Sequence, residues 1–221
     1  GDVNGIGYEV LLKCFSDTRM FENCTPILYG SSKVASYHKK LINATDFPFV
    51  NIRTVEQAET SKFNILNIIQ DEVKLDIGQA TEVGGRLAAM SLDYACHDLM
   101  QGKLDALVTN PINKKNIQSD KFNFPGHTEY LTNKFGVEES LMIMTCHDLH
   151  IGIMTNHLSL SQVPKVLDRE LILRKLQVMD SSLKRDFGIR MPKIAVLALN
   201  PHAGDRGLIG TEDDSIVAPA I

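Results

Sequence analysis

The stretch KIAVLALNPHAG, residues 193–204, decides the fold class. Residues 193–199 are almost entirely apolar and predict a buried strand, which ends abruptly at an Asn-Pro turn. The same arrangement occurs earlier in the chain, where residues 105–109 lead into Asn110 and Pro111. Strands that are apolar along their whole length are typical of parallel sheets covered by helices on both faces.

Strand-like and helix-like patterns alternate along the rest of the chain. Ser31 and Ser32 offer an N-cap for one helix, and an apolar stripe over residues 168–187 indicates another, which Gly188 closes. Strands are expected at residues 26–30, 63–68, 105–109, 141–145, 150–155 and 193–199, and helices at 10–15, 32–41, 83–100, 128–135 and 168–187. The short link after residue 145 predicts a hairpin. This alternation predicts an α/β fold with layered helices and a largely parallel sheet.

Composition excludes several classes of function. The chain has 221 residues, 43% of them hydrophobic, and its 23 basic and 27 acidic side chains give a net charge of −4. The hydrophobic fraction supports a real core, while no apolar run approaches the ~20 residues of a membrane span. The negative net charge does not indicate binding to nucleic acid or to an anionic membrane. Cys14, Cys24, Cys96 and Cys146 form no C-x-x-C pair, so reduced cysteines and a cytoplasmic location are expected.

The two ends of the sequence suggest a fragment. The opening residues, GDVNGIG (1–7), form a glycine-rich turn with neither a starting Met nor a strand before it, and no secretion signal is visible. Residues 215–221 have the pattern of a helix still in progress. We therefore expect that the first strand and a C-terminal part are missing.

Ligands of open parallel sheets bind at the carboxyl ends of the strands, and this rule selects four loops. They are residues 1–7, 109–115, 156–157 and 200–204. The first is neither a Rossmann turn nor a P-loop, so it is either a backbone cradle for a ligand or a tight turn between strand and helix.

Two histidines follow predicted strands in these loops. His157 and His202 could project from the same edge of one sheet, and neutral imidazole is a common ligand of divalent metals. Each could instead be a capping or core residue. Two histidines do not complete a site, because catalytic zinc usually takes three protein ligands.

A further candidate region lies at residues 126–129, just before a predicted helix. Thr128 can be the N-cap of that helix, a role that needs no function, yet a helix N-terminus after His127 is also a place where anions bind. Lys114, in the loop after a predicted strand, can reach toward the cleft and pair with an anionic substrate, or it can be a solvated charge.

Five segments in matching order carry a resemblance that covers the whole chain. They are GDVNGIG at 1–7, ALVTNPINK at 106–114, FPGHTEY at 124–130, TNHLSL at 155–160 and LNPHAGDRGLIGTEDD at 199–214. Together they resemble the 4-hydroxythreonine-4-phosphate dehydrogenase family of vitamin B6 synthesis. The opening departs from the family's usual Pro and Ala at Val3 and Asn4, so no role is assigned to those two side chains.

The resemblance implies a fold similar to isocitrate and isopropylmalate dehydrogenases, with two α/β halves around a cleft and a homodimer that shares its active site. Residues 1–221 would then be an incomplete two-half enzyme. It also implies oxidation of 4-phosphohydroxy-L-threonine by NAD, followed by decarboxylation to 3-amino-2-oxopropyl phosphate on the route to pyridoxal 5'-phosphate.

The same resemblance assigns the site residues. It implies that His157 and His202 are two of three histidine ligands of a divalent metal (Zn, Mg or Co), the third being absent from this sequence. It also implies that His127 and Thr128 contact substrate, while Lys114 is a catalytic candidate by position alone. The alternatives are a related metal-dependent dehydrogenase for another phosphorylated hydroxy acid, a metal hydrolase or acyltransferase, and an inactive fragment.

Overall fold

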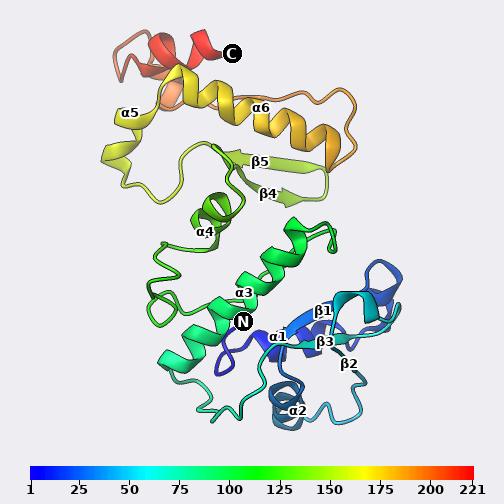
Figure 1. Cartoon of the computed structure of the whole chain (residues 1–221). Coiled ribbons are helices and arrows are strands. Elements are labelled where there is room, and N and C mark those ends of the chain that lie inside the picture. The colour runs from blue at the N-terminus through cyan, green and yellow to red at the C-terminus, as the bar shows by residue number, and fades with distance from the viewer. The chain divides into compact units, whose positions relative to one another are not determined.

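The chain folds into two compact units. A computed structural model describes residues 1–221 and divides them into Gly1–Phe135 and Gly136–Ile221 (Figure 1). None of its helices has the length and apolar character needed to cross a bilayer. The sequence had left the internal boundary open, and the structure puts it directly after the helix that carries His127.

Helices and strands alternate in the first unit, as the sequence predicts. It contains α1 (Gly7–Cys14), β1 (Ile27–Gly30), α2 (Ser32–Leu41), β2 (Val50–Ile52), β3 (Asn64–Asn67), α3 (Glu82–Met100) and α4 (His127–Lys134). The second unit contains β4 (Met142–Cys146), β5 (Leu149–Ile153), α5 (Val163–Val166) and α6 (Arg169–Arg185). The helix expected at the end of the chain is a pair of short helical turns, Asp213–Val217 and Ala218–Ala220.

A parallel sheet forms the centre of the first unit. Its strands lie in the order β1-β3-β2, and Ile65 of β3 pairs with Leu28 on one side and Asn51 on the other. One core joins α1 and α2 to Ile65, through Leu12 and Ala35 among others, while Ala95 of α3 packs with Tyr29 and Leu66 in a second core. The unit therefore has three layers, with α1 and α2 on one side of the sheet and α3 on the other (Figure 1).

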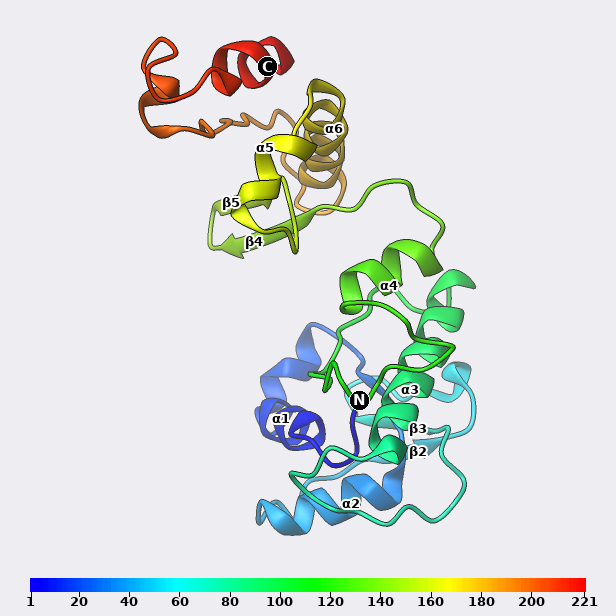
Figure 2. The same cartoon turned by 90° about the vertical axis from the view of Figure 1, so that its left-hand side faces the viewer.

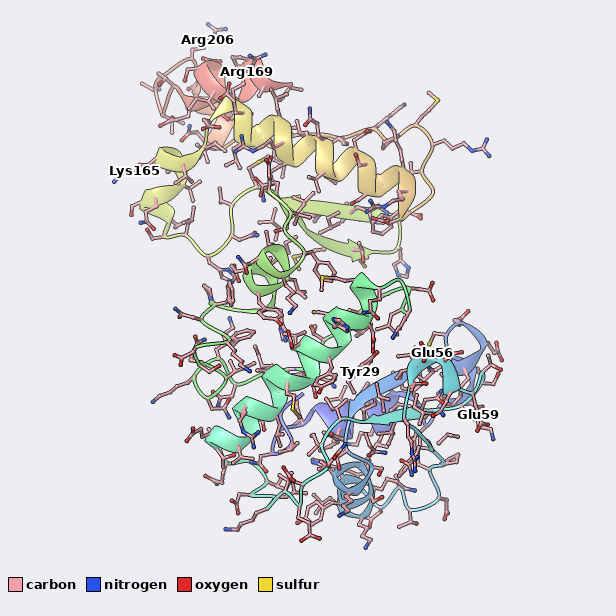
Figure 3. All side chains as sticks on the ribbon, viewed as in Figure 1. Tyr29, Glu56, Glu59, Lys165, Arg169 and Arg206 are labelled. Carbon is pink, nitrogen blue, oxygen red and sulfur yellow. The ribbon has the colours of Figure 1, made fainter.

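Buried polar contacts fix α3 on the sheet. The Tyr29 hydroxyl donates to Asp98 Oδ2 at 2.7 Å, and Ser91 Oγ donates to the carbonyl of Tyr29 at 2.8 Å. Tyr29 lies between β1 and α3 in Figure 3. At the other end of α3, a Cβ on Gly85 would collide with the main chain of Asn116. Only glycine permits this close approach of loop and helix.

Two predicted strands are wrong. Residues 105–109 and 193–199 are extended but have no partner in any sheet. In residues 193–197 the side chains alternate between half-buried and exposed, and Val196 packs against a core. In residues 105–109 Leu107 alone is half-buried, and Val108 is 89% exposed. An apolar run in the sequence indicates only that some of its side chains are buried. A strand also needs a neighbouring segment with which its backbone forms hydrogen bonds. The structure also contains a strand that the sequence analysis missed, the three-residue β2.

The predicted hairpin is confirmed in the second unit. Strands β4 and β5 pair antiparallel from Met142↔Ile153 to Cys146↔Leu149, which leaves a two-residue turn at His147 and Asp148. Helix α6 covers one face of this hairpin (Figure 2). Gly152 of β5 lies against Met179, and the rings of His150 and Phe187 lie 4.3 Å apart at an interplanar angle of 50°.

A buried ion pair holds α6 to the segment that enters the hairpin. Lys175 is 7% exposed and its ammonium lies 2.6 Å from Glu139 Oε1, while it also donates to the carbonyl of Ser140. Burial raises the pKa of the Glu139 carboxyl, but the hydrogen bond and charge of Lys175 outweigh it, so the pKa lies below its ordinary value of 4.5.

This ion pair predicts a pH-dependent loss of stability. Glu139→Gln removes a charge-assisted bond and should lower the free energy of unfolding by about 1–3 kcal/mol at pH 7. A carboxyl whose pKa is lower in the folded protein stabilises the fold at pH values above its pKa in the unfolded chain. This stabilisation is lost as the pH falls through the pKa of the folded state. The difference between wild type and variant in urea unfolding should therefore shrink below pH 4.5. A difference that is constant from pH 7 to pH 3 would contradict this assignment.

Candidate functional site

Two of the loops that the sequence selects come together in the first unit. A Cβ placed on Gly1 or on Gly7 would lie 3.0 or 3.1 Å from Cβ of Asn110. The side chain of Asn110 therefore rests on the glycines of the opening turn, where larger residues would displace it. The opening turn and the loop of residues 109–115 form one surface, although residues 105–109 are not the predicted strand.

The opening turn is held by buried polar side chains. Asp2 is 6% exposed, and its carboxylate accepts from the Asn4 amide at 2.9 Å and from Asn116 Nδ2 at 3.2 Å. Asn116 Nδ2 also donates to the carbonyl of Thr81, the N-cap of α3. These bonds connect the turn, the start of α3 and the loop that follows Asn110.

The two positions without an assigned role are structural in this chain. Val3 is fully buried in the core shared by α1 and α2. Asn4 donates from Nδ2 to Thr81 Oγ1 at 2.9 Å and accepts from the amide of Asp76 at 2.9 Å. The departure from the family's usual residues thus places an amide where it links the turn to two other segments.

Lys114 lies in a single turn that its neighbours define. Asn113 Oδ1 accepts from the amides of Lys115 and Asn116, which starts the turn, and Ile117 is buried behind it. Gln118 Nε2 donates to the carbonyl of Lys114 at 3.0 Å and to that of Phe124 at 2.9 Å. This bridge ties the Lys114 turn to the segment that leads into α4.

His127 is the first residue of α4, and Lys114 lies close to it. The position of a Cβ on Gly126 is 3.9 Å from Lys114 Cε. Burial lowers the pKa of His127 below its ordinary value of 6.5, and the positive charge of Lys114 adds to this. The imidazole is therefore neutral at pH 7 and can donate from one nitrogen and accept at the other.

The helix start differs from the prediction at Thr128. Gly126, with extended backbone, takes the N-cap position and makes no side-chain capping bond, while Thr128 is the second residue of the helix. The prediction of Thr128 as the N-cap is wrong because the helical conformation already begins at His127. The amide groups of this first turn and the nearby Lys114 favour an anion. The carboxylate of Glu129 belongs to the same turn, and its Oε2 lies 3.6 Å from the position of a Cβ on Gly126.

The two predicted metal ligands, His157 and His202, lie in the second unit. They were expected at one edge of a shared sheet, and the structure does not have that arrangement. His157 follows β5, which belongs to an antiparallel hairpin, and His202 follows the unpaired residues 193–199. Neither lies at an edge of the parallel sheet, so a common sheet edge does not bring them together. Both have left-handed backbones, with φ of 50° at His157 and 54° at His202.

His202 begins an unusual run of left-handed residues. All six residues from His202 to Gly207 have positive φ, and four of them are not glycine. This conformation costs a non-glycine residue about 1–2 kcal/mol. Arg206, in the same turn, extends from the surface in Figure 3. Such strain persists only where surrounding contacts over-determine the turn.

The donors for a metal fit in kind but are too few. Both predicted ligands are imidazoles, which divalent zinc and cobalt accept. No group of three or more His, Cys, Asp or Glu side chains is placed to hold a metal ion. Residues 1–221 therefore supply at most part of a metal site.

A cavity of about 860 Å³ lies elsewhere in the first unit. Five phenylalanines line it, with Phe63 and Phe47 buried beneath Phe15, Phe21 and Phe49. It includes none of the predicted site residues, and no residue of this chain is assigned to a nicotinamide cofactor.

The sequence analysis missed the side chains that hold these loops. Asp2 and Asn116 in the first unit, and Asp213 in the second, are buried or partly buried and make the bonds on which the loops depend. The only signal was that Asp2 and Asp213 lie inside segments selected for other residues, while Asn116 lies just outside one. Hydrogen-bond partners that are far apart in sequence carry no periodicity.

Comparison with known proteins agrees with the resemblance in the sequence. A family model described as pyridoxal phosphate biosynthetic protein PdxA matches residues 22–221. A 4-hydroxythreonine-4-phosphate dehydrogenase of Bacteroides thetaiotaomicron is 44% identical over all of this chain and 61% of its own length. A putative D-threonate 4-phosphate dehydrogenase of Clostridium botulinum is 31% identical over the whole chain and 66% of its own length.

Solved structures match along the whole chain as well. A 4-hydroxythreonine-4-phosphate dehydrogenase from Klebsiella pneumoniae superimposes with a TM-score of 0.86 at 28% identity, over 100% of this chain and 67% of that one. The chain thus spans about three fifths to two thirds of the length of these relatives. By its sequence and its α/β fold with a parallel sheet, the chain belongs to the PdxA family of pyridoxal phosphate biosynthetic proteins.

Proposed function

We propose that the natural protein containing this chain is an NAD-dependent 4-hydroxythreonine-4-phosphate dehydrogenase. It would oxidise 4-phosphohydroxy-L-threonine to 2-amino-3-oxo-4-phosphobutanoate, which then loses CO2 to give 3-amino-2-oxopropyl phosphate. The observation that carries the proposal is the placement of Lys114 beside His127 at the start of α4, in a chain 44% identical throughout to a protein of that name.

The residues of the first unit suit an anionic substrate. The Lys114 ammonium, the neutral His127 imidazole and the amides at the start of α4 all favour a phosphate or carboxylate. Thr128 in the same turn is the second substrate contact. Lys114 is also the candidate for proton transfer at the hydroxyl that is oxidised, because it lies beside the presumed anion site on a fixed turn.

The second unit would contribute to a divalent metal. His157 and His202 would supply two imidazole ligands, with a third donor from outside residues 1–221. When bound, NAD accepts the hydride and the metal supplies Lewis-acid stabilisation of negative charge on substrate oxygen. The work of this chain is to hold both imidazoles in place.

The proposal extends to the assembly. A fold like that of isocitrate and isopropylmalate dehydrogenases, with two halves around a cleft, is expected for the natural protein, and a homodimer would share its active site. The expected protein is cytoplasmic and acts on a small phosphorylated molecule, with no nucleic acid or membrane as partner. Its net charge of −4 agrees with the absence of a polyanionic partner.

A second candidate activity is oxidation of D-threonate 4-phosphate. The observation in its favour is the 31% identity with relatives that are named for this substrate. Both molecules carry a phosphate and a carboxylate around an oxidisable hydroxyl, so the anion-binding residues of the first unit serve either one. The group beside the carboxylate, amino or hydroxyl, distinguishes the two.

An assay of NADH formation tests the proposal. The natural protein, supplied with NAD and a divalent metal, should reduce NAD with 4-phosphohydroxy-L-threonine and release CO2. A higher kcat/KM with D-threonate 4-phosphate would favour the second candidate. No reduction of NAD or NADP with either substrate would contradict both. The isolated 221-residue chain serves as a control and should be inactive, because it lacks a group of three metal donors.

Replacement of His127 should reduce activity without unfolding the protein. His127→Ala removes a hydrogen bond to a charged substrate group, worth about 1.5–3 kcal/mol, so kcat/KM should fall about 10- to 150-fold. His97→Ala is the matched control, because His97 is exposed on α3 and contacts only Gln101 of its own helix. Circular dichroism should be unchanged in both variants. A His127→Ala enzyme with wild-type kcat/KM would remove His127 from the site.

A further inference from the structure

Asp213 makes a set of bonds that reaches well beyond its own position. The residue is 5% exposed. Its Oδ1 accepts from the amide of Leu199 at 2.7 Å, and its Oδ2 accepts from the amide of Asn200 at 2.9 Å and from Asn200 Nδ2 at 3.0 Å. One carboxylate thus holds two successive amides that lie 13 and 14 residues earlier in the chain.

This pattern is not that of a helix cap. Asp213 begins the helical turn Asp213–Val217, and a capping carboxylate would accept from amides within that turn. Its bonds run instead to Leu199 and Asn200, at the end of residues 193–199. Asp213 therefore fixes where that extended segment stops and the next turn begins.

The turn that begins there carries His202. His202 lies two residues after Asn200 and starts the left-handed run that ends at Gly207. Within the left-handed run, Gly204 packs against the carbonyl of Gly210. A Cβ on Gly204 would collide with that carbonyl oxygen, so no larger residue fits there. Because the left-handed run is unfavourable by itself, contacts outside it must hold it, and the Asp213 carboxylate supplies them at its start.

The charge of Asp213 suits this role. Burial raises the pKa of the carboxyl, but the bonds from the amides of Leu199 and Asn200 outweigh this and lower it below its ordinary value. The group is therefore ionised at neutral pH and acts only as an acceptor. An amide at the same position would point a donor at one of the two main-chain amides.

We propose that Asp213 is a positioning residue that holds His202 in its orientation toward the metal. This inference rests on the proposed function, in which His202 is a metal ligand. Carboxylates and amides that orient a ligand in this way affect metal affinity about 10- to 100-fold.

The test measures Zn²⁺ affinity of the natural protein by titration calorimetry. Asp213→Asn should weaken binding about 10- to 100-fold. Asp214→Asn, the exposed neighbour with the same change of charge, should bind like wild type. Wild-type affinity in Asp213→Asn, together with weak binding in His202→Ala, would overturn the inference while leaving the proposed function in place.

A double variant separates positioning from general stability. If Asp213 acts through His202, the variant with both His202→Ala and Asp213→Asn should bind Zn²⁺ as weakly as His202→Ala alone. A further loss in the double variant would show a general structural effect and overturn the inference. Wild-type affinity in His202→Ala would instead contradict the ligand role of His202, and with it both proposals.

A milder change covers the case in which Asp213→Asn does not fold. Asn200→Ala removes only the side-chain bonds from Asn200 to Asp213 and Glu212. It should weaken Zn²⁺ binding by a smaller factor than Asp213→Asn, and by nothing further when His202 is already alanine. Unchanged affinity in Asn200→Ala would overturn the inference. A further loss when Asn200→Ala is added to His202→Ala would overturn it as well.

Discussion

The carboxylate of Asp2 is the contact on which the first unit's site depends. It lies at the start of α3, where a Cβ on Gly84 would come within 2.5 Å of Oδ1, and both of its oxygens accept hydrogen bonds. A buried carboxylate without partners would be strongly destabilising, so the positive end of α3 and the amides of Asn4 and Asn116 are required. In return, Asp2 fixes the opening turn and the loop after Asn110 to the same helix.

Lys114 and His127 lie downstream of this arrangement. Asn116 belongs to the turn that carries Lys114, and Gln118 extends the connection to the segment before α4. The second unit has a similar arrangement. Asp213 accepts hydrogen bonds from main-chain amides and so holds the segment before His202. In both units a buried aspartate sets the place of a loop that carries a proposed site residue.

The sequence predicted the elements whose signal is local. Helix α3 has a long apolar face, and the hairpin has two runs joined by a short link, so both were expected and both exist. The strands at residues 105–109 and 193–199 were wrong because a strand is a relation between two segments, while an apolar run describes only one. Asp2, Asn116 and Asp213 were missed for the same reason, since their partners lie between 13 and 114 residues away.

The central claim is that the bond between Asp2 and Asn116 couples the opening turn to the Lys114 loop, and a double-mutant cycle tests it most directly. The free energy of urea unfolding is measured for wild type, Asp2→Ala, Asn116→Ala and the double variant. A hydrogen bond to a buried charge predicts a coupling energy of about 1–3 kcal/mol between the two sites. Effects that add to within ~0.5 kcal/mol would show that the two segments are held independently and would contradict the claim.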